Sequence, residues 1–341
     1  MKGRVFGAGS IGNHLTYALR QHDYDVEVID IDDKALIRME KEIYPSRYGV
    51  WDENIKLLKQ PTNDYVDIEI IGTPPDTHTN LLVKRIENSK SKLWLVEKPF
   101  TYPSLKHIKK IEEILRNHNS SIFVGYNHSV SKAFIELLKD LKKDQVPKNI
   151  YCSWLEHWGG IFKAHPWLSG PEESYLGYQK RGGGALMEHS HGLHLLVLLF
   201  DFYSLKIKDI KSTILMDKLK NYDKKTYLQF TFENSENASF YSTDVISIET
   251  NKSISIETDD FNYKVIFGSD NGRSDTYVKK SKFDQISKKF AKTRPDDFMP
   301  EISMLNDFLK YKNKSDFIKN LSLDYGLKAA SICARVFENN K

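Results

Sequence analysis

The chain has 341 residues, a length that suits two domains of ordinary size. Hydrophobic residues make up 40% of the sequence and aromatic residues 12%, and this apolar content excludes a disordered chain. The 50 Lys and Arg residues nearly balance the 46 Asp and Glu residues, so the net charge of +4 gives no support to a nucleic-acid-binding protein.

Apolar runs and cysteines bear on the location of the protein. The longest apolar run, residues 195–200, is far shorter than the roughly 20 residues that span a bilayer. A strand-like segment begins almost at Met1 and leaves no room for a secretory signal. Cys152 and Cys333 are too few for a disulfide framework and suit buried thiols in a reducing compartment. We therefore expect a cytoplasmic protein that does not associate with membranes.

The first part of the chain alternates between short apolar runs and helical patterns. Strands that alternate with helices imply parallel βαβ units. The sequence thus predicts an α/β domain with a doubly wound parallel sheet of Rossmann type over residues 1–124. We expect its strands over residues 1–6, 25–30, 66–72, 93–96 and 121–125, and its helices over residues 12–21, 34–44, 78–88 and 105–117.

The pattern changes from residue 125 onward. Consecutive short alternating runs joined by polar turns predict an antiparallel sheet in an α+β domain over residues 125–341, and the final helices could pack back on the first domain. We expect strands over residues 149–158, 205–215, 227–232, 238–245, 253–258 and 263–268, and helices over residues 186–200, 298–311 and 323–339.

A basic segment follows these strands. Residues 279–294 contain seven Lys or Arg residues and one acidic residue, and Phe283, Ile286 and Phe290 recur at helical spacing. We expect a solvated amphipathic helix or loop that packs on the second domain. Contact with an anionic partner or a nucleotide portion of the substrate is the alternative.

A glycine-rich motif, Gly-Ala-Gly-Ser-Ile-Gly, lies between the first predicted strand and the first predicted helix. In this context the first glycine permits a tight turn, the second lets the backbone approach a pyrophosphate, and the third lets the helix pack on the strand. The phosphates would lie at the positive end of the helix. The candidate cofactor contacts in this motif are Gly7, Gly9, Ser10, Ile11 and Gly12.

An acidic residue ends the second predicted strand. Asp30 lies 18 residues after Gly12, and a carboxylate there would accept hydrogen bonds from the hydroxyl groups of the adenosine ribose. The same charge would repel a 2′-phosphate, and the next residue is Ile31 rather than Arg. These features predict NAD as the cofactor in preference to NADP.

Later motifs resemble a known enzyme family. Ile-Gly-Thr-Pro-Pro-Asp-Thr-His occupies residues 71–78, Val-Glu-Lys-Pro residues 96–99, Gly-Tyr-Asn residues 125–127 and Gly-Gly-Gly-Ala-Leu residues 182–186. Together with the glycine motif they resemble the Gfo/Idh/MocA family of the glucose-fructose oxidoreductase and inositol dehydrogenase type, over essentially the whole chain.

This resemblance implies a function and an assembly. The function is NAD(P)-dependent hydride transfer between the nicotinamide and a secondary alcohol or ketone of a sugar, sugar acid or nucleotide-sugar. The resemblance also implies that the second domain is built on an open, mostly antiparallel sheet. The exposed face of that sheet often forms the subunit contact, so we expect a homodimer or homotetramer.

The Glu-Lys-Pro motif carries the first catalytic candidate. The catalytic lysine of the family carries over to Lys98, which follows a predicted strand at the carboxyl edge of the sheet, where α/β sheets bind ligands. Its ammonium group could hydrogen-bond a substrate hydroxyl and stabilise alkoxide character. The residues expected to line the cofactor beyond the glycine loop are Thr73, Pro74, His78, Glu97 and Lys98.

The next family motif is altered in this chain. The family usually follows its glycine run with an Asp and, four residues later, a His, whereas here Glu188 takes the Asp position and Gly192 the His position. In a continuous helix Glu188, His191 and His194 would lie along one side, and His189 would point elsewhere. We therefore expect His191 to be the general acid or base, with Glu188 orienting it or binding a hydroxyl group. Inert polar residues on a partly buried helix are the alternative.

A metal site is the competing interpretation of the histidines in this region. Five of the 11 histidines fall within 38 residues, but the sequence has no His-Glu-x-x-His pattern or other established ligand spacing. Hydride transfer to NAD in the family needs no metal. We therefore expect no metal site among His157, His165, His189, His191 and His194.

Aromatic and basic residues cluster between residues 151 and 181 and suit the binding of a carbohydrate. The same residues could equally form aromatic core and a gate loop. His128 stands where relatives often carry Arg, which weakens the case for recognition of a phosphate or an acid there. The candidate substrate-binding residues are Lys98, Asn127, His128, Trp158, Trp167, Glu188, His191 and His194.

Two other functions remain open at this point. The altered motif is compatible with a non-catalytic NAD-binding sensor or regulator on the same fold. An imine or biliverdin-type reductase on a related fold is the second alternative.

Overall fold

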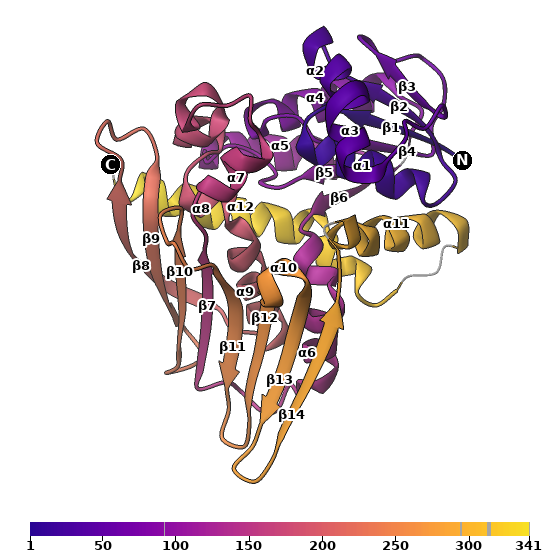
Figure 1. Ribbon diagram of the computed structural model, residues 1–341. Coiled ribbons are helices and arrows are strands. Elements are labelled where there is room, and N and C mark those ends of the chain that lie inside the picture. The colour runs from indigo at the N-terminus through magenta and orange to yellow at the C-terminus, as the bar shows by residue number, and fades with distance from the viewer. Residues whose placement is uncertain (92, 294, 312–314, 341) are drawn as a thin grey trace.

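The strands of the molecule form two sheets that lie one above the other in Figure 1. The structure is a computed structural model that describes residues 1–91, 93–293, 295–311 and 315–340. The strands of the first sheet are β1 (Lys2–Phe6), β2 (Asp25–Ile29), β3 (Ile55–Leu58), β4 (Ile68–Ile71), β5 (Leu93–Glu97) and β6 (Ser121–Gly125).

The first sheet has the strand order β3-β2-β1-β4-β5-β6, and each of its pairings is parallel. This topology confirms the predicted doubly wound sheet. All residues of β4 and β5 are buried, as expected for parallel strands covered on both faces. The helices of this region are α1 (Ser10–Arg20), α2 (Asp33–Arg38), α3 (Tyr44–Tyr48), α4 (Pro75–Asn88) and α5 (Leu105–Arg116), and a π-helical turn, Met39–Ile43, joins α2 to α3.

The second sheet has the order β14-β13-β12-β11-β7-β10-β9-β8. Its pairings are antiparallel except for the parallel pair β7 and β10, which confirms the predicted, mostly antiparallel sheet. Its strands are β7 (Asn149–Leu155), β8 (Ile207–Met216), β9 (Asp223–Phe232), β10 (Ala238–Asp244), β11 (Asn251–Glu257), β12 (Asn262–Gly268), β13 (Ser274–Lys280) and β14 (Gln285–Ala291).

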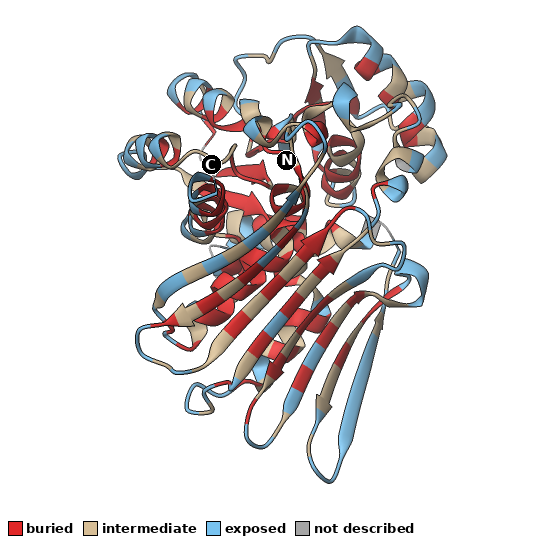
Figure 2. Ribbon diagram, turned by 90° about the vertical axis from the view of Figure 1, so that its left-hand side faces the viewer, coloured by how far each residue is buried: buried red, intermediate tan, exposed pale blue. Residues whose placement is uncertain are grey.

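Helices pack against one face of the second sheet. Burial alternates along its strands, with buried side chains on the helix side and more exposed ones on the outer face (Figure 2). Tyr151 and Tyr227 on the outer face are each 39% exposed. The helices of this region are α6 (Lys132–Asp140), α7 (Gly159–Ala164), α8 (Ala185–Glu188), α9 (Ser190–Phe202) and the short α10 (Ser269–Gly272).

The basic segment forms a β-hairpin over residues 279–291, so the prediction of a helix or loop there was wrong, and residue 294 of the segment lies outside the described residues. It comprises the end of β13, a turn and β14. The Ser281 hydroxyl accepts hydrogen bonds from the backbone N–H groups of Phe283 and Asp284 and thereby forms the turn. Ile286 and Phe290 are four residues apart, a spacing that places two side chains on one face of a strand as well as of a helix.

The final two helices, α11 (Met299–Tyr311) and α12 (Leu323–Glu338), return to the first sheet (Figure 1). Ile302 of α11 joins the core on one face of that sheet, and Leu327 of α12 joins the core on the other. The division into domains at residue 124 remains a prediction. Within the described ranges, none of the helices has the length and apolar character needed to cross a membrane.

Candidate functional site

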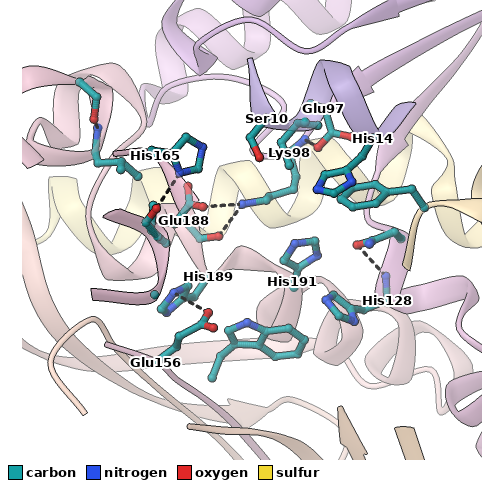
Figure 3. A pocket seen from close by; sticks show the side chains of 18 of the residues that line it. Ser10, His14, Glu97, Lys98, His128, Glu156, His165, Glu188, His189 and His191 are labelled. Atoms are coloured by element: carbon teal, nitrogen blue, oxygen red, sulfur yellow. Dashed lines mark hydrogen bonds and ion pairs between the residues drawn. The ribbon is translucent and has the colours of Figure 1, made fainter. Parts of the chain in front are cut away.

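A cavity of about 680 Å³ opens beside the carboxyl edge of the first sheet, within the size range of small-molecule sites. The first sheet and its helices contribute Ser10 and Lys98, and the second region contributes Trp154 and Glu188. Figure 3 shows Lys98 reaching from one side toward Glu188 on the other. The cavity is therefore lined by residues from both halves of the chain.

The glycine motif forms the turn between β1 and α1. Gly7 has a φ of +102°, a conformation that favours glycine. A Cβ atom on Gly12 would lie 1.9 Å from the carbonyl oxygen of Gly7, whereas a Cβ on Gly9 would meet nothing within 4 Å. The loop is thus closely packed at Gly12 and open at Gly9, where a pyrophosphate group could approach the backbone.

The amino end of α1 has the features of an anion site. Gly9 is the N-cap residue and no side chain caps the helix, and Ser10 and Ile11 line the cavity. Free N–H groups at such a terminus favour a pyrophosphate. Asp30 supports the same loop, because its Oδ2 accepts a hydrogen bond of 2.9 Å from the backbone N–H of Ala8. These residues fit a dinucleotide.

Lys98 is held by the altered family motif. Its Nζ donates hydrogen bonds of 2.9 Å to the carbonyl oxygen and 3.0 Å to the Oε1 of Glu188. The hydroxyl group of Tyr175 donates to the other carboxylate oxygen at 3.0 Å. Burial raises the pKa of Glu188, but the charge of Lys98 and these hydrogen bonds outweigh it, so the pKa lies below its ordinary value. Lys98 and Glu188 therefore form an ion pair inside the cavity.

His78 is buried between two loops and does not line the cavity. Its Nδ1 lies 3.1 Å from the carbonyl oxygen of Pro99, and its Nε2 faces the carbonyl oxygen of Thr73. Burial lowers its pKa to about 4, against the opposing effect of these backbone carbonyl groups. His78 thus links the loop after β4 to the loop that carries Lys98. Thr73 and Pro74 likewise do not line this cavity, whereas Glu97 does.

The helix expected over residues 186–200 is interrupted at His189, which has φ −92° and ψ 18° between α8 and α9. Because of this break, Glu188, His189 and His191 all line the cavity, and the prediction that His189 points elsewhere was wrong. The start of α8 is fixed by Asp223, whose Oδ2 accepts a hydrogen bond of 2.9 Å from the N–H of Leu186.

His191 lies in an aromatic setting. Its ring stacks on Trp154 at 5.5 Å between centroids and meets the edge of His128 at 4.7 Å. Burial lowers its pKa well below the ordinary value, and His128 and Lys98 add to this effect. His191 is therefore a neutral imidazole, and within the described part of the chain its buried Nδ1 has no hydrogen-bond partner.

Other predicted substrate residues differ in their placement. Asn127 and His128 line the cavity, but Trp158, Trp167 and His194 do not. Trp158 is buried in a small apolar cluster, Trp167 packs under the guanidinium group of Arg38 at 4.3 Å, and the His194 ring stacks on Tyr126 at 3.9 Å.

Sequence reasoning missed several residues that line the cavity. Arg47 donates from Nη1 to the hydroxyl oxygen of Ser10 at 2.9 Å. Glu156 follows β7 and forms an ion pair with Lys252 of β11, with 2.7 Å between Nζ and Oε2. The two partners are 96 residues apart in the chain, and no local motif marks such a pair. Among the side chains that the structure describes, no group of three or more His, Cys, Asp or Glu is placed to hold a metal ion.

A comparison with protein families gives a match to the first part of the chain. A model of the oxidoreductase family with an NAD-binding Rossmann fold, the Gfo/Idh/MocA type, matches residues 2–126. Over these residues the chain is similar to that family. The family description names NAD, which confirms the predicted cofactor.

Single proteins similar to this chain include dehydrogenases and a regulator. The scyllo-inositol 2-dehydrogenase (NAD(+)) of Bacillus subtilis is 25% identical over 171 residues, which are 46% of this chain and 48% of that protein, so the match spans about half of the relative. The UDP-N-acetylglucosamine 3-dehydrogenase of Acidithiobacillus ferrooxidans superposes with a TM-score of 0.72 and 15% identity, over 98% of this chain and 96% of that chain.

A third similar structure is a super-repressor mutant of Gal80p from Saccharomyces cerevisiae. Its TM-score is 0.76 at 13% identity, and the match covers 100% of this chain and 95% of that chain. At such low identity the similarities to solved structures establish the fold, and they extend it over both sheets.

Proposed function

We propose that this chain is an NAD-dependent oxidoreductase that transfers a hydride between the nicotinamide and a secondary alcohol or ketone carbon of a carbohydrate-type substrate. The observation that carries the proposal is the partly buried Lys98–Glu188 pair, which lines the same cavity as the amino end of α1. The dehydrogenases among the similar proteins support the reaction class.

The side chains of the cavity can bind and activate a hydroxyl group. The nicotinamide of bound NAD supplies the hydride chemistry. The Lys98 ammonium donates a hydrogen bond to the reacting oxygen and stabilises alkoxide character there, and Glu188 holds the ammonium in place. His191 takes up the hydroxyl proton. Although its pKa is lowered, the hydroxyl group becomes strongly acidic as the hydride leaves, so a weak base suffices.

Assembly and location are part of the proposal. Tyr151, Phe240 and Tyr227 stack in sequence on the outer face of the second sheet, with ring centroids 5.2 and 6.3 Å apart. An apolar patch of this kind suits a subunit contact, so we propose a homodimer or homotetramer through this face. Cys152 and Cys333 are free buried thiols, which favours a reducing, cytoplasmic location.

Turnover of a polyol panel with NAD⁺ tests the reaction, followed by the absorbance of the reduced nicotinamide. Lys98→Met should lower kcat by roughly 10²-fold or more, as for other charge-stabilising groups, while calorimetric NAD⁺ binding stays within about twofold. Lys148→Met is the matched control, because Lys148 pairs with Asp259 outside the cavity. Full activity of Lys98→Met would refute the assignment.

A second candidate is an NAD-binding regulator without turnover. The fold similarity to Gal80p and the replaced family motif favour it. Tight NAD⁺ binding with no turnover of any polyol, ketone or sugar acid by wild-type protein would support this candidate instead.

A further inference from the structure

The wall formed by Glu156, His189 and Lys252 carries a further inference, which rests on the proposed function. Glu156 follows β7, Lys252 lies on β11, and His189 occupies the break between α8 and α9. Figure 3 shows the His189 ring and the Glu156 carboxylate facing each other, apart from the Lys98–Glu188 pair. The group is therefore placed to contact a part of the substrate other than the reacting carbon.

The hydrogen bonds around His189 determine its tautomer. Its Nδ1 lies 3.2 Å from the hydroxyl oxygen of Thr243. That hydroxyl donates its single hydrogen to a backbone carbonyl, with the oxygen of Trp154 at 3.0 Å, so it can only accept from His189. Burial lowers the pKa of His189 to about 4, so the ring is neutral. The proton is on Nδ1, and Nε2 carries a lone pair.

The Nε2 atom of His189 therefore needs a donor. Among the described residues this buried atom has no hydrogen-bond partner, and it lies 4.0 Å from the Oε2 of Glu156, which is also an acceptor. Two acceptors at this separation cannot bond to each other, but a hydroxyl group between them can donate to either one. A buried acceptor that lines a cavity and lacks a donor points to a ligand that supplies one.

The charges of the cavity indicate which ligand. The ammonium groups of Lys98 and Lys252 already face the carboxylates of Glu188 and Glu156, at 3.0 and 2.7 Å. A carboxylate or phosphate on the substrate that bound either ammonium group would have to displace a protein carboxylate from it. Arg47 also lines the cavity, but it bonds to Ser10 at the amino end of α1, on the cofactor side. A hydroxyl group can accept from the ammonium and donate to the carboxylate, which leaves each pair intact.

We propose that Glu156, His189 and Lys252 form a hydroxyl-binding subsite, and that the substrate is an uncharged polyhydroxylated ring rather than a sugar acid. The subsite holds hydroxyl groups remote from the carbon that is oxidised. Because these contacts are remote from the reacting carbon, they are the same in the ground state and the transition state, so their loss raises KM more than it lowers kcat.

Binding and turnover of three probes test the subsite: scyllo-inositol, D-glucose, and D-glucuronate as the charged counterpart of D-glucose. Calorimetry on NAD⁺-loaded protein should detect scyllo-inositol or D-glucose and show weaker binding of D-glucuronate. Glu156→Gln should raise the Kd and the KM of the uncharged probe about tenfold to a hundredfold. It should also reduce the difference in affinity between that probe and D-glucuronate. Lys252→Met should weaken the binding of the same probe.

Glu257→Gln is the matched control. Glu257 also lies on β11, but it bonds to the Asn149 amide outside the cavity, so its variant should bind the probes as the wild type does. Tighter binding of D-glucuronate than of D-glucose, no binding of any probe, or an unchanged Glu156→Gln variant would overturn the subsite. Polyol binding without turnover would instead refute the proposed function and leave the subsite standing.

Discussion

Gly9 and Gly12 serve the same loop in different ways, and substitution separates them. A methyl group on Gly12 would lie 1.9 Å from the backbone oxygen of Gly7, whereas one on Gly9 would point into open space. Gly12→Ala should therefore lower the free energy of unfolding by about 1–3 kcal/mol, as overpacking does. Gly9→Ala should keep the melting temperature within a few degrees but weaken NAD⁺ binding about tenfold, because it occupies the approach to the helix terminus.

Thermal unfolding and calorimetry measure the two effects on the same preparations. Equal destabilisation by both substitutions would contradict this division of roles.

Glu97 makes the free energy of unfolding depend on pH, and its pKa shift gives the sign of that dependence. Burial raises its pKa from 4.5 to about 7, against the lowering effect of Lys98. The folded state therefore holds a proton that the unfolded state has already released, and the free energy of unfolding falls as the pH rises from 4.5 to about 7. The slope contributed by one such group is at most about 1.4 kcal/mol per pH unit.

Glu97→Gln removes this titration, so its urea midpoint should fall less than that of the wild type between about pH 5 and pH 7. The carboxyl of Glu301, whose pKa is raised by burial and then by the charge of Glu97, should lose part of its own shift in the same variant. Parallel pH curves for variant and wild type would show that Glu97 does not titrate in this range.

At the level of single residues, the sequence predicted what local spacing encodes. Lys98 sits in a recognisable tripeptide after a strand, and Glu188 and His191 in a short altered motif, and all three line one cavity. Glu156 and Lys252 could not be predicted, because only the pairing of β7 with β11 brings them together. Trp158 and Trp167 show the opposite error, since aromatic content alone does not distinguish core from cavity wall.

The junction of α8 and α9 determines the shape of the site at the level of elements. Asp223 accepts hydrogen bonds from the N–H of Leu186 and, at 2.7 Å, from the hydroxyl of Thr226. Asp223→Ala should leave these buried donors unpaired and lower the free energy of unfolding by about 1–3 kcal/mol, with a larger loss of activity than of NAD⁺ binding. Denaturant unfolding checks this, with Asp209→Ala on the exposed edge strand β8 as the control. Unchanged unfolding of Asp223→Ala would exclude the role.

Helices and strands could be told apart from the sequence where the spacing of apolar residues fits only one of them. The apolar runs of β4 and β5 identify buried parallel strands. Over residues 285–291 the apolar positions lie four apart, a spacing that fits both a helix and a strand, and the sheet partner β13 decides between them. The break at His189 falls within the polar residues 188–192, and helical spacing alone did not indicate that the helix is interrupted there.

The outer face of the second sheet governs the assembly of the whole molecule. If Tyr227 lies in a subunit contact, Tyr227→Glu should bury a charge there and convert the assembly to monomers. Tyr311 on α11 is 69% exposed, and Tyr311→Glu should leave the mass of the assembly in solution unchanged. Light scattering at several concentrations measures this. A monomeric wild type, or an unaltered Tyr227→Glu assembly, would contradict the proposed contact.

The return of α11 and α12 to the first sheet has a consequence for biosynthesis. Ile302 and Leu305 cover one side of that sheet, and Leu327 and Ala330 cover the other. During translation the dinucleotide-binding half therefore leaves the ribosome with part of each face of its sheet uncovered. Its packing is completed only after residues 299–338 have emerged. A nascent chain arrested before that point should engage chaperones rather than coenzyme, although its entire glycine fingerprint has already been synthesised.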